Sequence, residues 1–74
     1  MKLPRDVSGS KVIKVLIGDY GWEVHGRKGT HVTLKKREEK DILTVPTHDE
    51  LKPGLFLAIL RKAKIERDDF LEKL

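Results

Sequence analysis

The sequence contains no cysteine and no long hydrophobic run, and each absence excludes a class of protein. Without cysteine, disulfide scaffolds, thiol catalysis and cysteine-based zinc sites are excluded. No apolar stretch approaches the roughly 18 residues of a membrane span, and the first residues lack the apolar core of a signal peptide. We therefore expect a cytoplasmic protein with no membrane association, and its stability must come from packing.

The common signatures of nucleotide-binding and hydrolytic enzymes are also missing. The chain has no Gly-Lys-Ser/Thr phosphate loop, no Gly-x-Ser-x-Gly elbow and no Gly-x-Gly-x-x-Gly fingerprint. Its 74 residues are enough for one small hydrophobic core and no second lobe. We therefore expect a single domain over residues 1–74, without a nucleotide cofactor.

Charge, by contrast, is abundant and unevenly distributed. Lysine and arginine number 16 against 12 acidic residues, giving a net charge of +4. The excess lies within residues 1–48, because residues 49–74 hold six bases and six acids. A basic cluster of this kind favours a polyanionic partner such as RNA, although solvated charge on a hairpin is the simpler alternative. The cluster consists of Arg27, Lys28, Lys35, Lys36, Arg37 and Lys40.

The spacing of hydrophobic residues predicts an α+β fold with the order α-β-β-β-α-α. The segment Ser8-Gly9-Ser10 can cap a helix over residues 9–20, where apolar residues recur every three or four positions, and Gly21 can end it. We expect a three-stranded antiparallel sheet with helices on one face and solvent on the other. The strands are expected at residues 22–25, 30–36 and 42–45, with a loop at 26–29, and two further helices at 53–64 and 66–74.

On this outline, His31 lies on the open face of the sheet, just after a glycine-containing loop. Lys35 shares that face, and Arg27 and Lys28 approach from the loop. RNA carries its own nucleophile in the 2′-hydroxyl, so its cleavage requires only proton transfer and stabilisation of negative charge at phosphorus. One histidine with two or three cations can supply both. The alternative is an ordinary surface histidine.

The two other histidines admit functional and structural interpretations. Strand alternation places His25 on the same side as His31, where it is either a second proton-transfer group or, as we favour, a polar surface residue. His48 follows Pro46 and can cap a loop or reach a phosphate, and we favour a structural role. A zinc site built from the three histidines lacks a fourth ligand, so we expect no metal.

Several short segments also occur in a characteristic order along the chain. In that order and spacing, residues 8–72 resemble the HicA (YcfA-like) toxins of prokaryotic toxin–antitoxin systems. The segments are SG at 8–9, VIKVL at 12–16, GW at 21–22, KGTH at 28–31, TVPTH at 44–48, LKPG at 51–54 and ILRKA at 59–63.

The resemblance implies a fold, an activity and a partner. The fold is that of the double-stranded-RNA-binding domain, the activity is metal-independent endonucleolytic cleavage of mRNA, and the partner is a HicB antitoxin. The Gly-Ser/Thr-His motif of the family falls on Gly29-Thr30-His31, so His31 is the implied catalytic residue. The residues expected to bind RNA are Arg27, Lys28, Gly29, Thr30, Lys35 and Lys36.

Two departures from the family pattern fall on the helix expected at 53–64. Leu55-Phe56-Leu57 stands where the family often has Thr-Leu-Arg, and Lys64 replaces a common glycine. These changes leave the histidine motif intact but put an RNA contact of this helix in doubt. Two alternatives stay open: a non-catalytic RNA-binding module of the same fold, and an interaction protein that docks an acidic partner. The first is weakened because no basic cluster opens this helix.

Overall fold

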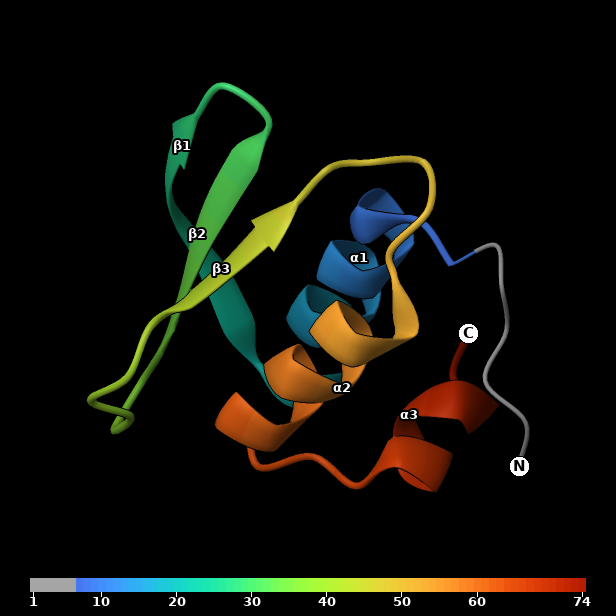
Figure 1. Ribbon diagram of the computed structural model, residues 1–74. Coiled ribbons are helices and arrows are strands. Elements are labelled where there is room, and N and C mark those ends of the chain that lie inside the picture. The colour runs from blue at the N-terminus through green and yellow to red at the C-terminus, as the bar shows by residue number, and fades with distance from the viewer. Residues whose placement is uncertain (1–6) are drawn as a thin grey trace.

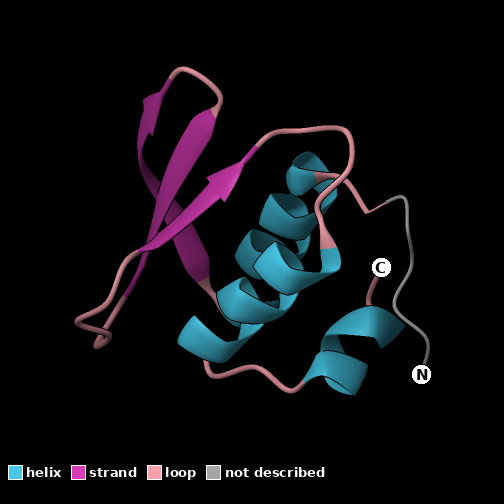
Figure 2. Cartoon of the chain, viewed as in Figure 1, coloured by secondary structure: helices cyan, strands magenta, loops and turns pink. Residues whose placement is uncertain are grey.

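The computed structural model describes residues 7–74, and the domain expected over residues 1–74 therefore includes six residues that lie outside the described part. The predicted α+β class and the element order α-β-β-β-α-α are confirmed (Figures 1 and 2). The elements are α1 (Gly9–Tyr20), β1 (Trp22–Lys28), β2 (His31–Lys36), β3 (Leu43–Pro46), α2 (Pro53–Lys62) and α3 (Arg67–Glu72).

Helix α1 has the bounds that its end signals predict. The Ser8 side chain accepts a hydrogen bond of 3.1 Å from the backbone N–H of Lys11, which satisfies one of the free donors of the first turn. At the other end Gly21 takes a left-handed φ of 77°, and its N–H donates to the carbonyl of Leu16. No helix within residues 7–74 is long and apolar enough to cross a membrane.

The sheet is an antiparallel meander in the order β1-β2-β3, and the helices lie on one side of it (Figure 1). Side chains on the central strand β2 alternate accordingly. Val32 and Leu34 are buried toward the helices, whereas His31 and Lys35 are exposed on the opposite side. The predicted open face of the sheet is therefore confirmed, and it carries His31.

Strand β1 differs from its prediction, because it continues through the expected loop at 26–29. Val24 pairs with Leu34 and Gly26 with Thr33, so His25 is an extra residue in a β-bulge. The bulge shifts the alternation of β1 by one residue. Residues beyond it therefore exchange faces relative to an unbroken strand. The connection that remains between β1 and β2 is only Gly29-Thr30.

The other boundaries move by one or two residues. Pro46 lies just beyond the strand expected at 42–45 but is the last residue of β3, which an edge strand tolerates because the missing N–H is not needed there. Helix α2 ends at Lys62, because Lys64 takes a left-handed φ of 60°. The last helix is shorter than the expected 66–74.

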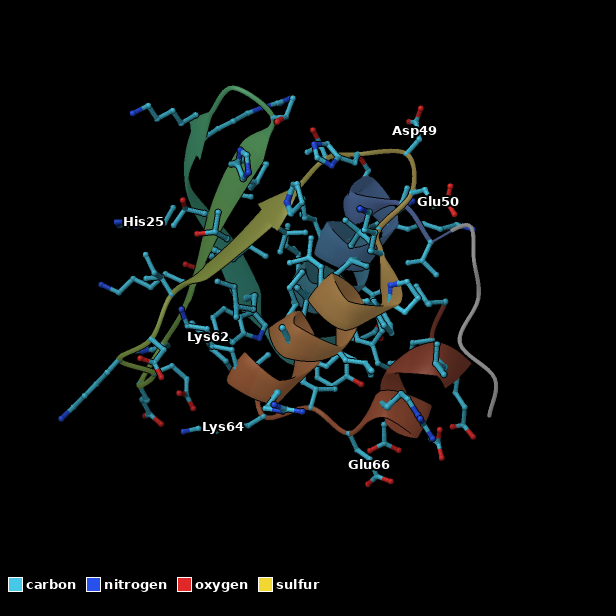
Figure 3. All side chains as sticks on the ribbon, in the orientation of Figure 1. His25, Asp49, Glu50, Lys62, Lys64 and Glu66 are labelled. Atoms are coloured by element: carbon cyan, nitrogen blue, oxygen red, sulfur yellow. The ribbon has the colours of Figure 1, made fainter. Side chains whose placement is uncertain are left out.

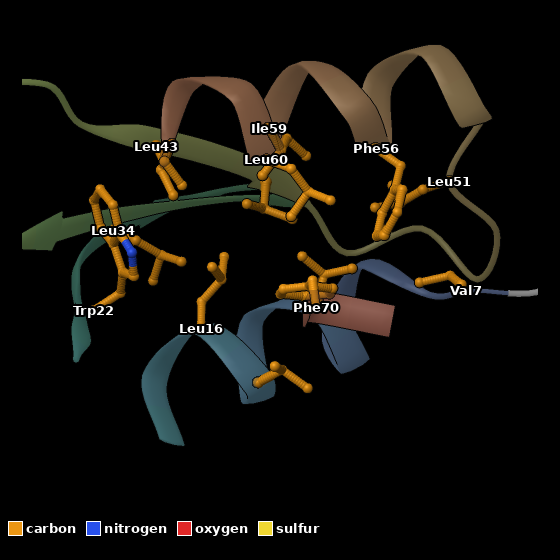
Figure 4. Packing of buried hydrophobic residues seen from close by; sticks show 14 of the residues in the cluster. Val7, Leu16, Trp22, Leu34, Leu43, Leu51, Phe56, Ile59, Leu60 and Phe70 are labelled. Atoms are coloured by element: carbon orange, nitrogen blue, oxygen red, sulfur yellow. The ribbon is translucent and has the colours of Figure 1, made fainter. Parts of the chain in front are cut away.

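The hydrophobic core lies between the sheet and the helices (Figure 4). Trp22 and Leu34 from the sheet meet Leu16 of α1 and Leu60 of α2 within one buried cluster. Phe70 of α3 has no exposed surface and packs against the rings of Tyr20 and Phe56, with centroids 5.9 Å and 5.6 Å away. Helix α3 thus completes the core and leaves the open face of the sheet uncovered.

Candidate functional site

The β1–β2 turn is a tight, glycine-dependent reversal that lies next to His31. Gly29 has a φ of 60° and Thr30 does not share this conformation, which is the pattern of a type II′ turn with glycine in its first central position. The carbonyl of Thr30 accepts two hydrogen bonds from Thr47, one from its N–H at 2.7 Å and one from its hydroxyl at 3.1 Å. The turn is therefore fastened to the segment that follows β3.

That segment is in turn fastened to the start of α1. The N–H of Gly9 donates to the carbonyl of His48 at 2.9 Å, and the N–H of Leu51 donates to the carbonyl of Val7 at 2.8 Å. A Cβ atom on Gly9 would lie 1.6 Å from the carbonyl oxygen of Pro46, so only glycine permits this approach. Hydrogen bonds to α1 and to the hairpin turn thus anchor the loop between β3 and α2 (Figure 2) near His48.

These contacts bring His31 and His48 together. Their ring centroids are 6.4 Å apart and the ring planes meet at 70°, and both side chains are exposed. The sequence favours a structural role for His48 and does not predict a catalytic pair with His31. The pairing of His31 with Pro46 places His48 only two residues beyond a cross-strand neighbour. The sequence does not show which distant segments pair in the sheet, so it does not place His48 beside His31.

Lys28 is the cation closest in register to His31. The two residues pair directly across β1 and β2, and directly opposed residues share a face of the sheet. Arg27 pairs with Val32 and so starts from the other face, and its Nε donates to the carbonyl of Gly29 at 3.4 Å. The bulge at His25 produces this arrangement, because an unbroken β1 would turn Lys28 toward the helices.

Lys35 and Lys36 lie at the opposite end of β2 and on opposite faces. Lys35 shares the open face with His31, four residues and thus about 13 Å away, and it faces Glu23 across the strand pair. Lys36 pairs with the buried Trp22 and is half-buried on the helical side. The predicted RNA-binding residues are therefore divided between the two faces of the sheet. Lys28 and Lys35 lie on the same face as His31, whereas Arg27 and Lys36 lie on the helical face. Gly29 and Thr30 form the turn next to His31.

His25 does not join the pair formed by His31 and His48. It lies at the bulge of β1 and points away from the helices (Figure 3). Within residues 7–74 no three His, Asp or Glu side chains lie close enough together to hold a metal ion. The candidate site thus consists of His31 and His48 with Lys28 beside them.

The comparison with protein families agrees with the resemblance seen in the sequence. The model of the HicA toxin of bacterial toxin–antitoxin systems matches residues 9–65. No individually curated protein matches the chain. The matched part begins with α1, contains the hairpin with His31 and the loop with His48, and stops before α3. Since it covers most of the chain, the protein belongs to the HicA toxin family of bacterial toxin–antitoxin systems.

Proposed function

We propose that this toxin is a metal-independent endoribonuclease that cleaves mRNA in the cytoplasm, with His31 as the catalytic base. The observation that carries the proposal is an exposed histidine on the open face of the sheet with Lys28 directly opposite. Membership in the HicA family supports RNA as the substrate, because toxins of this family are mRNA interferases.

The cleavage step uses groups that this surface supplies. The His31 imidazole takes the proton of a ribose 2′-hydroxyl, and the 2′-oxygen forms a bond to the adjacent phosphorus. The bond from phosphorus to the 5′-oxygen breaks, leaving a 2′,3′-cyclic phosphate and a 5′-hydroxyl end. The ammonium group of Lys28 stabilises the negative charge that accumulates on the phosphorus oxygens.

The open face also offers a track for the RNA on either side of the cut. Between the rows of His31 and Lys35, the residues paired across the sheet are Gly26, Thr33 and Thr44. These small residues let a sugar-phosphate backbone approach the sheet closely. Lys35, about 13 Å along β2, can then meet a neighbouring phosphate.

The experiment is cleavage of a defined single-stranded RNA by the purified protein in EDTA, with analysis of the new ends. We expect cutting to continue, with 2′,3′-cyclic phosphate and 5′-hydroxyl ends, and to stop at a position where the nucleotide before the cut is 2′-deoxy. Abolition by EDTA with rescue by a divalent ion would contradict the proposal. Binding of RNA without cutting would favour a non-catalytic module instead.

We propose further that a HicB-like antitoxin silences the toxin by covering this surface. An enzyme that cuts mRNA in its own compartment requires a blocker, and covering His31 is the simplest means. The basic residues around it, Lys28 and Lys35 among them, favour an acidic antitoxin surface that associates rapidly and in a salt-sensitive manner.

A further inference from the structure

We propose that His48 is a second catalytic residue, which donates the proton to the 5′-oxygen as the RNA strand breaks. The inference rests on the proposed function, because it completes the reaction that His31 begins. Removing the 2′ proton is only half of the proton transfer. A 5′-alkoxide is a poor leaving group, so a second group that supplies a proton accelerates the break.

The distance between the two imidazoles allows His31 to act as the base and His48 as the acid. Ring centroids 6.4 Å apart place the rings near enough for each to form a hydrogen bond of about 2.6–3.2 Å to a different oxygen of one phosphodiester. The rings meet at 70° rather than stacking face to face, and both are exposed to an incoming strand. Among the described residues, no hydrogen bond occupies either imidazole.

The structural contribution of His48 comes from its main chain. Its carbonyl accepts the hydrogen bond from Gly9, and the preceding Thr47 is fixed by two bonds to Thr30. Neither connection uses the imidazole. The backbone thus holds this side chain beside His31 while leaving the ring free, which is the arrangement that a preorganised catalytic group needs.

The proton balance of the step is closed by the two histidines. His31 begins neutral and ends as imidazolium after taking the 2′ proton. His48 begins as imidazolium and ends neutral after giving its proton to the 5′-oxygen. Exchange of one proton each with water restores the starting state, so no metal ion or other co-reactant is required.

The test compares His48→Ala on ordinary RNA and on RNA in which sulfur replaces the 5′-oxygen at the cut. A thiolate leaves without being protonated, so this substrate does not need an acid. We expect His48→Ala to lower the cleavage rate of ordinary RNA by about 10²–10⁴-fold and to cleave the sulfur substrate at close to the wild-type rate. His31→Ala should be slow on both, and His25→Ala, an exposed histidine away from the site, should cleave both normally.

Each other outcome has a defined meaning. Wild-type cleavage of ordinary RNA by His48→Ala would overturn the inference and leave the proposed function standing, as would an equal loss on both substrates, which would make His48 a positioning residue. No cleavage by the wild-type protein would overturn both. His48→Gln, which keeps a polar side chain but supplies no imidazolium, should behave like His48→Ala, and thermal unfolding should show both variants folded.

Discussion

The substitution Gly9→Ala tests whether the packing of α1 positions the site. Its new methyl group would start 1.6 Å from the carbonyl oxygen of Pro46, whereas real contacts of this kind exceed 3.0 Å. The carbonyl of Pro46 is backbone and the Cβ position is fixed by the backbone of residue 9, so a rotamer change cannot relieve the clash. The first turn of α1 and the 46–48 segment must separate, and the hydrogen bond from Gly9 to His48 is lost or lengthened.

These contacts give an estimate of the free energy of unfolding that Gly9→Ala loses. Overpacking of this kind costs about 1–3 kcal/mol, and loss of the hydrogen bond adds about 0.5–1.5 kcal/mol. The higher helix propensity of alanine offsets at most about 1 kcal/mol. We expect the free energy of unfolding to fall by about 2–3 kcal/mol, which lowers Tm by roughly 10–20 °C in a domain of this size.

The assay is denaturant unfolding followed by the fluorescence of Trp22, the single tryptophan, which is 2% exposed. The matched control is Gly18→Ala, in the same helix, where a Cβ meets nothing within 4 Å and where we expect a gain of about 0.5–1 kcal/mol. RNA cleavage by Gly9→Ala should also fall at temperatures where it remains folded, because His48 moves away from His31. Equal stability of the two variants would show that the close approach of Gly9 to Pro46 is not required for the fold.

Three further predictions concern the end of α2, the charge of the open face and the antitoxin. Lys64→Gly should raise the free energy of unfolding by about 0.5–1 kcal/mol, because Lys64 has a φ of 60° and its ion pair with Glu39 is exposed. The control Ala58→Gly, exposed within α2, should lower the free energy of unfolding by about 1 kcal/mol. Denaturant unfolding measures both, and a loss of stability in Lys64→Gly would show that the left-handed φ of Lys64 carries no cost. Lys28→Glu should weaken RNA binding and flatten its salt dependence, whereas Lys73→Glu should bind RNA normally. Equal losses of RNA affinity in a binding titration would indicate that only the net charge matters. The antitoxin should stop cleavage at one-to-one stoichiometry and protect residues 26–31 from hydrogen exchange, and protection confined to α3 would rule out steric blocking.

The parts of the fold that were predicted correctly are those with local signals. Ser8 and Gly21 mark the ends of α1 through capping interactions that involve only neighbouring residues. The alternation of β2 is uninterrupted, so the placement of His31 on the open face follows from the pattern alone. The end of α2 was less well predicted, because a lysine in a left-handed conformation gives no sequence signal.

The parts that were missed depend on contacts between distant segments. The bulge at His25 is set by how β1 pairs with β2, and although Gly26 is a residue type common at bulges, it fits the expected loop at 26–29 equally well. The approach of His48 to His31 requires the pairing of β2 with β3 and the contact of Gly9 with the loop. The sequence therefore indicates His31 as a site residue but not its neighbour His48.

We propose that His31 carries out the chemistry, and the RNA cleavage rate of purified His31→Ala in EDTA tests this role most directly. We expect the rate to fall by about 10²–10⁴-fold with an unchanged unfolding curve, because the exposed side chain of His31 adds nothing to the core. His25→Ala, prepared in the same way, should keep the wild-type rate. A wild-type rate for His31→Ala would show that His31 is not the catalytic base.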